Sequence, residues 1–390
     1  MDREKRRMWS ETLVNIQETQ GRGRGVVSYQ PLRGGDVVVR DSPLLLYSAF
    51  PLSRSSITST PTSTSVYCDN CYRKIHSAVI CCPTCSHHKF CSPNCVSASS
   101  NTPWVCQALS RLHDCSSLVV HQPLERQVQA RFLIAAYNLF LVSPSNFQIL
   151  LSLQGQGGGG DDEDAQFLHS LISSLCPPTG GVPFSLELTS ALLAKDKLNA
   201  FGLMEPFDIN DGKRSVRAYG IYPKAALFNH DCLPNACRFD YVDTQDTDLI
   251  IRMIHDVPQG REICLSYFPV NYDYSTRQKR LREDYGFICD CDRCKVEANW
   301  SDQEHDDADD DENENEAMEE DSEEAMADEK DDAPSDNDSD FPHAYFFLRY
   351  MCDGTNCWGT LAPLAQSNVN ITLLECNVCG KIKRDEVGHS

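Results

Sequence analysis

The chain lacks any long hydrophobic run. Its first ten residues, MDREKRRMWS, are polar and charged, and no apolar segment typical of a secretory signal follows them. The longest apolar run, residues 133–142, contains an asparagine and is too short to cross a lipid bilayer. We therefore expect an intracellular protein that does not enter the membrane.

The chain also lacks a surplus of basic residues. Its net charge is −22, but residues 301–340 hold 22 acidic residues and one lysine, so the remainder is close to neutral. A near-neutral body offers no basic surface for duplex DNA, which argues against a zinc-finger DNA-binding protein. The acidic segment has almost no apolar side chains, and we predict that it is disordered. It would be either a solvated linker or an arm that attracts basic partners.

Cysteine, by contrast, is abundant, with 20 residues in a chain of 390. In a reducing compartment this number favours zinc sites over disulfides. Three cysteine pairs between residues 68 and 95 have the short spacing with which two thiolates bind one zinc ion from a tight turn. We predict two interleaved sites: Cys68, Cys71, Cys91 and Cys95 in the first, and Cys82, Cys85, Cys106 and His113 in the second. The eighth ligand stays open, because His87, His88, Cys81 and Cys115 are alternatives to His113.

Two further cysteine groups bring the expected number of zinc sites to about four. Cys232 lies in the loop Asn229–Asn235, which also carries two amides and an imidazole. Residues 289–294 carry three thiols, one short of a tetrahedral zinc site, and Cys232 is the candidate for the fourth ligand. The last group is typical of a small structural zinc ribbon. The predicted ligand sets are Cys232, Cys289, Cys291 and Cys294, and then Cys352, Cys357, Cys376 and Cys379.

The spacing of apolar residues predicts several regular elements. A repeat of every four residues from Leu124 to Phe140 indicates an amphipathic helix, and residues 185–197 and 276–285 are also expected to be helical. Residues 1–50 are expected to form a helical lead, followed by β-rich segments at 26–28 and 37–39 with a hairpin-type turn at 33–36. Residues 51–66 have the composition of a linker, and residues 199–268 that of short strands and turns.

In kind and order, these motifs resemble a known family. The Gly-Arg-Gly start, the Cys/His insert and the segments GIYPKAALFNHDCLPN, REICLSYFPVNY and YGFICDCDRC are similar to the SET domain of protein lysine methyltransferases split by a MYND zinc module. This is the SMYD architecture, and the chain resembles its plant ASH-related branch. The resemblance implies a mixed, β-dominated SET fold with a pseudoknotted core. The expected parts are an N-terminal SET part (10–50), a MYND-type module (68–115), a helical insert (116–198), the catalytic core (199–270), a post-SET zinc segment (271–300), the disordered acidic insert (301–340) and a zinc-ribbon-like unit (341–384).

The resemblance also implies an activity, which is S-adenosylmethionine-dependent methylation of lysine in a histone or another protein, in the nucleus, the cytoplasm or both. Proline-rich peptides are possible partners of a MYND module, and the alternative function is a non-catalytic scaffold that binds partner peptides in transcriptional regulation. The chain departs from the family at Asp231, where a smaller residue is usual, and in lacking a C-terminal helical repeat domain.

The same resemblance assigns roles to residues of this sequence. Tyr267 and Tyr285 match catalytic residues, and both line the lysine channel together with Phe201. The residues that match the cofactor site are Arg22, Gly23, Arg24, Asn229, His230, Tyr267 and Phe287.

Overall fold

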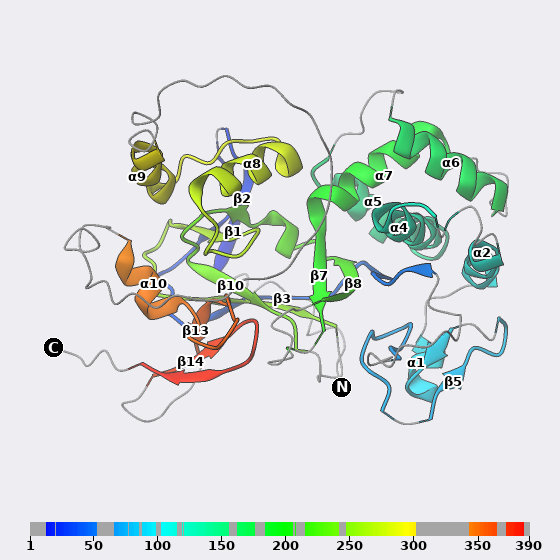
Figure 1. Ribbon diagram of the computed structural model, residues 1–390, viewed down its shortest axis with the longest axis horizontal. Helices are drawn as coiled ribbons and strands as arrows, with labels where there is room; N and C mark the ends of the chain where they lie inside the picture. The colour runs from blue at the N-terminus through cyan, green and yellow to red at the C-terminus, as the bar shows by residue number, and fades with distance from the viewer. Residues whose placement is uncertain are drawn as a thin grey trace, which may run out of the picture.

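The computed structural model of the protein describes residues 13–19, 21–52, 66–76, 78–85, 88–98, 103–114, 119, 121–155, 162–175, 184–205, 207, 215–241, 247–301, 343–364 and 372–385. The predicted acidic insert and the predicted linker fall almost entirely outside these residues, as does most of the predicted helical lead. Figure 1 shows two neighbouring parts, a body of small sheets on the left and a group of helices on the right.

Three sheets form the body. Their strand orders are β1-β2-β12-β9, β10-β11-β3 and β4-β8-β7. The strands are β1 (Val14–Thr19), β2 (Gly23–Ser28), β3 (Val37–Asp41), β4 (Leu45–Ser48), β7 (Ala200–Met204), β8 (Val216–Ile221), β9 (Asn229–His230), β10 (Ala236–Phe239), β11 (Leu249–Met253) and β12 (Glu262–Leu265). The predicted abundance of short strands between residues 199 and 268 is confirmed.

One pairing in the body differs from the rest. The two-residue strand β9 runs parallel to β12, with Asn229 opposite Cys264 and His230 opposite Leu265, whereas the other pairings among the described strands are antiparallel. Strand β12 in turn pairs with β2. The Asn229-His230 dipeptide is thereby held close to the beginning of the chain.

The N-terminal segment differs from its prediction. Residues Val14–Thr19 form strand β1, which makes a tight hairpin with β2 around Gly21 and Arg22. The expected hairpin-type turn at residues 33–36 joins two different sheets instead, because β2 pairs with β1 and β12 while β3 pairs with β11. Most side chains of β1 are exposed. Its strand conformation therefore depends on pairing with β2, which the local apolar pattern does not reveal.

The helical insert packs beside the body. It consists of α4 (Leu124–Val142), α5 (Pro144–Ser152), α6 (Glu163–Leu175) and α7 (Leu186–Asn199). The predicted helices at 124–140 and 185–197 are confirmed as α4 and α7. Ser185 caps α7, since its side chain accepts a hydrogen bond from the backbone N–H of Leu188. Helix α4 is the centre of the insert, and Phe132, Leu133 and Tyr137 lie in one hydrophobic core with residues of β4.

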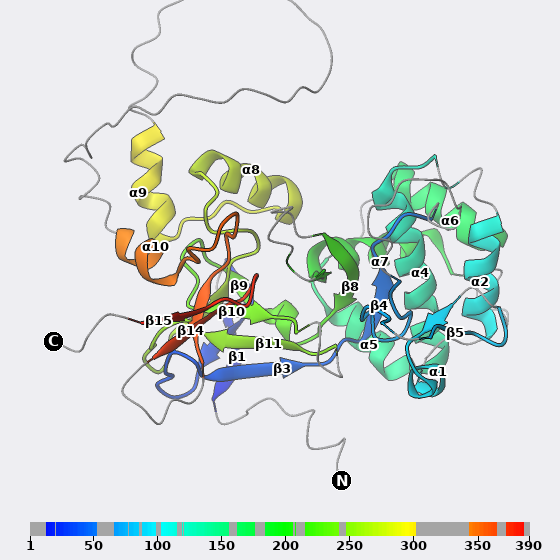
Figure 2. The same ribbon diagram turned by 60° about the horizontal axis from the view of Figure 1, so that its bottom comes forward.

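Two cysteine-rich units flank these parts. The Cys/His unit, residues 66–114, contains β5 (Ile80–Cys81), β6 (Lys89–Phe90), α1 (Pro93–Ala98) and α2 (Pro103–Asp114). In Figure 1, β5 and α1 lie below the helical insert and α2 lies beside α4. The C-terminal unit, residues 343–385, contains α10 (Ala344–Tyr350), β13 (Leu361–Pro363), β14 (Leu373–Cys376) and β15 (Ile382–Arg384). Figure 2 shows this unit against β10 and β11, on the side of the body opposite the helical insert.

Along the chain, α8 (Tyr274–Tyr285) and α9 (Asp292–Ser301) follow the strands of the body and precede the C-terminal unit, and α8 confirms the helix predicted at 276–285. A short 3-10 helix, η3 (Ala225–Leu227), leads into β9. Among the described helices, none combines the length and the hydrophobicity needed to span a bilayer.

A buried hydrogen bond joins the helical insert to the body and gives a testable pH dependence. Tyr47 on β4 donates from its hydroxyl to Asp196 on α7, and burial raises the pKa of Asp196 to about 7. A raised pKa means that the folded state holds this proton more tightly than the unfolded chain, whose carboxyl has a pKa near 3.8. The stability supplied by the proton is thus present below about pH 4 and is lost as the pH rises to about 7.

We therefore predict that Asp196→Asn gains stability relative to the wild type as the pH rises from about 4 to about 7, and that the difference is constant above this range. Urea unfolding at about pH 5 and about pH 8 measures it. Glu18→Gln, at an exposed position, is the control. A difference between Asp196→Asn and the wild type that does not change with pH would contradict the prediction.

Candidate functional site

The loop at the start of β2 and the dipeptide Asn229-His230 are tied together by Glu262. The Asn229 side-chain amide donates to one Glu262 carboxylate oxygen at 2.7 Å, and the Arg22 guanidinium pairs with the other at 2.9 Å. Arg22 also donates to the backbone oxygen of His230 at 2.8 Å. The structure thus brings Arg22, Asn229 and His230 together as predicted. Glu262 was not predicted, and only its position on a strand, two residues before Cys264, could have suggested it.

The glycines of this loop serve different purposes. Gly23 has a φ of +71°, in the left-handed region that favours glycine. At Gly25 the reason is space, because a Cβ atom would lie 2.5 Å from the Glu262 carboxylate and 2.8 Å from the Asn229 amide. The Arg24 side chain points toward the helical insert, where it donates to the Ser152 carbonyl at 2.8 Å. Arg24 therefore joins the loop to α5.

His230 is buried and electrically neutral. Burial lowers its pKa to about 3. Its Nδ1 accepts the backbone N–H of Tyr267 at 3.2 Å, so the proton resides on Nε2, which lies 3.3 Å from the sulfur of Cys232. One imidazole therefore fixes both the chain around Tyr267 and the thiol of Cys232.

Three aromatic rings, those of Tyr267, Phe268 and Phe287, lie around this imidazole, and Tyr285 packs on Tyr267. The Tyr267 ring lies 5.1 Å from the His230 ring and 4.8 Å from the Tyr285 ring, and the Phe287 ring lies 6.4 Å from His230. The Tyr267 hydroxyl donates to the backbone oxygen of Phe228 at 3.0 Å. Phe287 is 38% exposed, so part of this residue is accessible from solvent. The predicted neighbourhood of Tyr267, Tyr285 and Phe287 is thus found in the structure.

The end of α8 sets the positions of Tyr285 and Phe287. The helix begins at Asp273, whose carboxylate accepts the backbone N–H of Thr276 at 2.8 Å. It ends at Gly286, which has a φ of +76° and turns the chain sharply after Tyr285. The backbone N–H of Phe287 then returns to the Leu281 carbonyl at 3.1 Å. The two aromatic side chains therefore lie on either side of a glycine turn.

Directly after this turn, the chain is anchored by cysteines. The sulfurs of Cys232, Cys289, Cys291 and Cys294 all lie within 4.8 Å of one another. Cys232 is 3.5 Å from Cys294 and 4.0 Å from Cys289. Zinc–sulfur bonds of about 2.3 Å in a tetrahedron place sulfurs about 3.8 Å apart, so the arrangement fits a zinc ion. The structure therefore brings together all four cysteines of the predicted ligand set.

A charged group that the sequence analysis missed lies against these sulfurs. Arg277 on α8 is fully buried and donates to Cys232 at 3.2 Å and to Cys294 at 3.7 Å. Four thiolates around one zinc ion would carry an excess charge of about −2, and a guanidinium in this place offsets part of it. Glu297 accepts from Arg277 at 2.5 Å and from Arg293 at 2.6 Å, which closes a buried chain of alternating charges.

Gln278 is a second residue that the sequence analysis missed. Its side-chain amide donates to the Cys289 carbonyl at 2.7 Å and accepts the Cys289 backbone N–H at 3.1 Å. One side chain thereby satisfies both backbone groups of a cysteine. Sequence offers little signal for Arg277 or Gln278, since both lie in a charged helix that is expected to face solvent.

The other three cysteine groups are assembled too. The sets Cys68, Cys71, Cys91 and Cys95, and Cys352, Cys357, Cys376 and Cys379, match the prediction. The second group of the Cys/His unit needs a correction, because it consists of Cys82, Cys85, Cys106 and His88. The Nδ1 atom of His88 lies 3.0 Å from Cys85, so His88 takes the place predicted for His113. The local reason is that His88 directly precedes β6, which returns the chain to the Cys82–Cys85 turn.

Phe201, the remaining predicted channel residue, lies on β7. Its ring makes an edge contact with Tyr222 at 5.9 Å, and the guanidinium of Arg238 lies 5.6 Å from its centre. Burial raises the pKa of Tyr285, and the positive charges of Arg280 and Arg238 oppose this effect. Arg238 therefore contacts Phe201 directly, whereas its charge acts on Tyr285 without a direct contact in the described structure.

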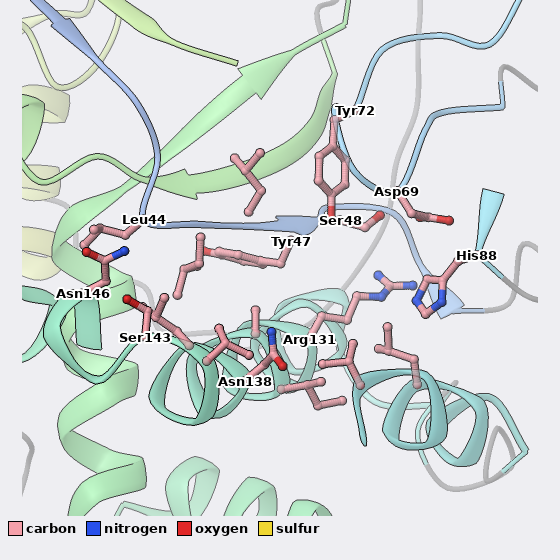
Figure 3. A pocket seen from close by; sticks show the side chains of 18 residues that line it. Leu44, Tyr47, Ser48, Asp69, Tyr72, His88, Arg131, Asn138, Ser143 and Asn146 are labelled. Atoms are coloured by element: carbon pink, nitrogen blue, oxygen red, sulfur yellow. The ribbon is translucent and has the colours of Figure 1, made fainter. Parts of the chain in front are cut away.

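A cavity of about 340 Å³ lies elsewhere, between β4, α4 and the Cys/His unit. Figure 3 shows Arg131 extending from α4 toward His88 and Asp69. Burial lowers the pKa of Arg131 to about 10 and raises that of Asp69 to about 6. None of the residues predicted to bind cofactor or lysine lines this cavity. Its lining residues come from the Cys/His unit, β4 and α4, so the cavity lies at the contact between these parts.

The Cys232 group gives a direct test. We predict that Cys291→Ser lowers the zinc content by about one ion per chain, because one thiolate of a tetrahedral site is lost. Elemental analysis of purified protein measures this. Cys81→Ser is the control, because Cys81 is exposed and belongs to none of the four groups. An unchanged zinc content in Cys291→Ser would show that these sulfurs hold no zinc.

Comparisons with known proteins place the chain among its relatives. Residues 23–268 match the SET domain family. The chain is 57% identical to the Arabidopsis thaliana histone-lysine N-methyltransferase ASHR2, over 97% of each protein. It is 25% identical to the human histone-lysine N-methyltransferase SMYD3, over 72% of this chain and 60% of SMYD3. Arabidopsis thaliana ASHR1 is 22% identical over 74% of this chain and 56% of its own length. The chain therefore belongs to the SET-domain family, with SMYD-type proteins among its relatives.

Proposed function

We propose that this protein is an S-adenosylmethionine-dependent protein lysine N-methyltransferase that acts on a histone or on another lysine-bearing protein. The observation that carries the proposal is the grouping of Asn229, His230 and Tyr267 beneath aromatic side chains anchored by a cysteine cluster. The relatives ASHR2 and SMYD3, whose names describe histone-lysine methyltransferases, support it.

The groups around β9 fit the proposed cofactor. The Arg22 side chain is 42% exposed and can bind a carboxylate. The Asn229 amide can donate or accept a hydrogen bond, and the Glu262 carboxylate can accept one or bind a positively charged group. Phe287 is partly exposed, and its aromatic ring would stack on an adenine ring. S-adenosylmethionine supplies the methyl group on a positively charged sulfur when it is bound. Arg22, Asn229, His230 and Phe287, with the backbone of Gly23 and Arg24, would hold it.

Tyr267 would orient the substrate amine. Burial raises the pKa of Tyr267 above its ordinary value, so its hydroxyl keeps its proton near neutral pH. It therefore acts as a hydrogen-bonding group of fixed position, held by the Phe228 carbonyl, and does not act as a base. A lysine between Tyr267, Tyr285 and Phe201 would lose contact with water, which favours its neutral, nucleophilic form. Position and desolvation are the contributions of the protein.

The cysteine groups support a further part of the proposal. We propose that the four groups hold about four zinc ions and that the Cys/His unit is a MYND module that splits the SET domain and binds proline-rich peptides. Residues 301–340 would be a solvated linker or an arm for basic partners such as histone tails. The protein would act in the nucleus, the cytoplasm or both, without contact to duplex DNA.

Calorimetric titration with S-adenosylmethionine tests the function. We expect the wild type to bind S-adenosylmethionine and Asn229→Ala to bind it more weakly. The substitution removes the side-chain amide that donates to Glu262 and that would contact the cofactor. Tyr267→Phe should bind the cofactor normally and transfer methyl groups to lysine roughly tenfold to a hundredfold more slowly, because the amine loses its orienting hydroxyl.

The same measurements separate the enzyme from the alternative, a non-catalytic scaffold. A wild type that binds S-adenosylmethionine but transfers no labelled methyl group to any protein of a nuclear extract would favour the scaffold. A wild-type protein that does not bind S-adenosylmethionine at all would contradict the proposed methyltransferase activity.

Gly25 gives a prediction of steric origin. Gly25→Ala should weaken S-adenosylmethionine binding by roughly tenfold or more, because its Cβ would displace both Asn229 and Glu262. Gln17→Ala is the matched control, since Gln17 is the exposed partner of Gly25 on β1. Equal affinities of the two variants, measured by calorimetry, would refute the close approach of Gly25 to Asn229.

A further inference from the structure

We infer that the C-terminal unit positions the lysine channel and the cofactor-side aromatics, with Phe347 and Asn377 as its points of contact. The inference rests on the proposed methyltransferase function. It assigns to residues far from the reacting groups a role in positioning those groups.

The C-terminal unit is fixed to the body by a buried polar network. Arg252 on β11 pairs with Glu375 on β14 at 2.7 Å, and both side chains are almost fully buried. The Tyr241 hydroxyl donates to Glu375 at 2.8 Å and accepts from Arg252 at 2.6 Å. The Arg252 guanidinium also covers the ring of Phe239 at 4.1 Å. Buried charges that are satisfied on several sides define one relative position of two units.

An apolar core continues this contact. Phe346 and Tyr350 of α10 and Ala362 of β13 pack with residues of β10 and β11. The C-terminal unit is therefore part of the rigid frame of the body, although only a short stretch of it approaches the candidate active site.

A first path leads from α10 to the Cys232 group. The ring of Phe347 lies 4.8 Å from the guanidinium of Arg293 on α9. Arg293 donates to the carbonyl oxygens of Val270 and Tyr272 at 2.6 and 3.1 Å, and to Glu297 at 2.6 Å. Each of the three guanidinium nitrogens thus donates a hydrogen bond within the protein, and Phe347 covers the face of the group.

The path continues through the buried charges. Glu297 holds Arg277, which donates to the sulfurs of Cys232 and Cys294. These sulfurs belong to the group that anchors the chain directly after Phe287. A loss of the ring at position 347 would let water reach Arg293 and loosen its hold on Glu297, and through Glu297 the hold on Arg277.

A second set of contacts leads from the C-terminal unit to Phe201 on β7, on the other side of the proposed lysine channel. Asn377 of the C-terminal unit donates from its side chain to the backbone oxygen of Arg238 at 3.2 Å. Arg238, on β10, covers the ring of Phe201 and donates to the carbonyl of Gly202 at 3.2 Å. The C-terminal unit is therefore linked both to the cysteine group that follows Phe287 and to the β7 side of the proposed channel.

Two variants on one helix test the first path. Phe347→Ala removes the ring over Arg293, whereas Leu348→Ala alters a neighbouring side chain that is 77% exposed. Phe347→Tyr keeps an aromatic face and should restore the wild-type behaviour. If Phe347→Ala does not fold, Phe347→Leu replaces it, because leucine keeps apolar volume without an aromatic face.

Amide hydrogen exchange of residues 285–294 is the first readout, and it does not require activity. We expect faster exchange in Phe347→Ala than in Leu348→Ala, Phe347→Tyr or the wild type. Calorimetry should show S-adenosylmethionine binding weakened about fivefold, the size expected of one cation–π contact. The kcat should fall by a similar factor while the KM for a lysine peptide changes less, with full zinc content.

The outcomes separate the two proposals. Exchange, affinity and kcat in Phe347→Ala equal to those of Leu348→Ala would overturn the positioning role, even if the wild type is an active methyltransferase. Faster exchange at residues 285–294 in a protein without methyl transfer would support the structural path while contradicting the proposed function.

Discussion

The meeting of Cys232 with Cys289, Cys291 and Cys294 is the constraint on which the candidate active site depends. Cys232 lies two residues after His230, and the other three cysteines follow the Gly286 turn that separates Tyr285 from Phe287. A single metal-sized cluster therefore fixes the distance between the Asn229-His230 strand and the aromatic side chains that cover it. Without it, residues 286–291 would have few anchors other than the two hydrogen bonds of Gln278.

Charged and polar side chains surround the sulfurs of this cluster. Arg277 brings a positive charge to two of its sulfurs, and Glu297 and Arg293 hold that charge in place. His230 adds an N–H directed at Cys232 while it accepts the backbone of Tyr267. The Cys232 cluster and the tyrosine of the proposed lysine channel are therefore coupled through one neutral imidazole.

The sequence indicated the parts that depend on local patterns. Cysteine spacing identified the four groups, because short spacings limit which thiols can share a metal ion, and α4, α7 and α8 followed from apolar periodicity and charge. It failed where pairing at a distance decides the structure. Strand β1 depends on β2, and His88 replaces His113 because the return of the chain at β6 brings it to Cys85. Glu262, Arg277 and Gln278 lie in ordinary polar sequence contexts, and only the tertiary structure shows which groups they contact.

A crystal structure of the protein with S-adenosylhomocysteine, with diffraction data collected at the zinc absorption edge, tests the central claim most directly. The account predicts an anomalous peak at the centre of the sulfurs of Cys232, Cys289, Cys291 and Cys294. It also predicts a bound cofactor product that contacts Asn229 and the ring of Phe287. A cofactor product bound elsewhere, or sulfurs of this group joined as a disulfide without a metal peak, would contradict the account.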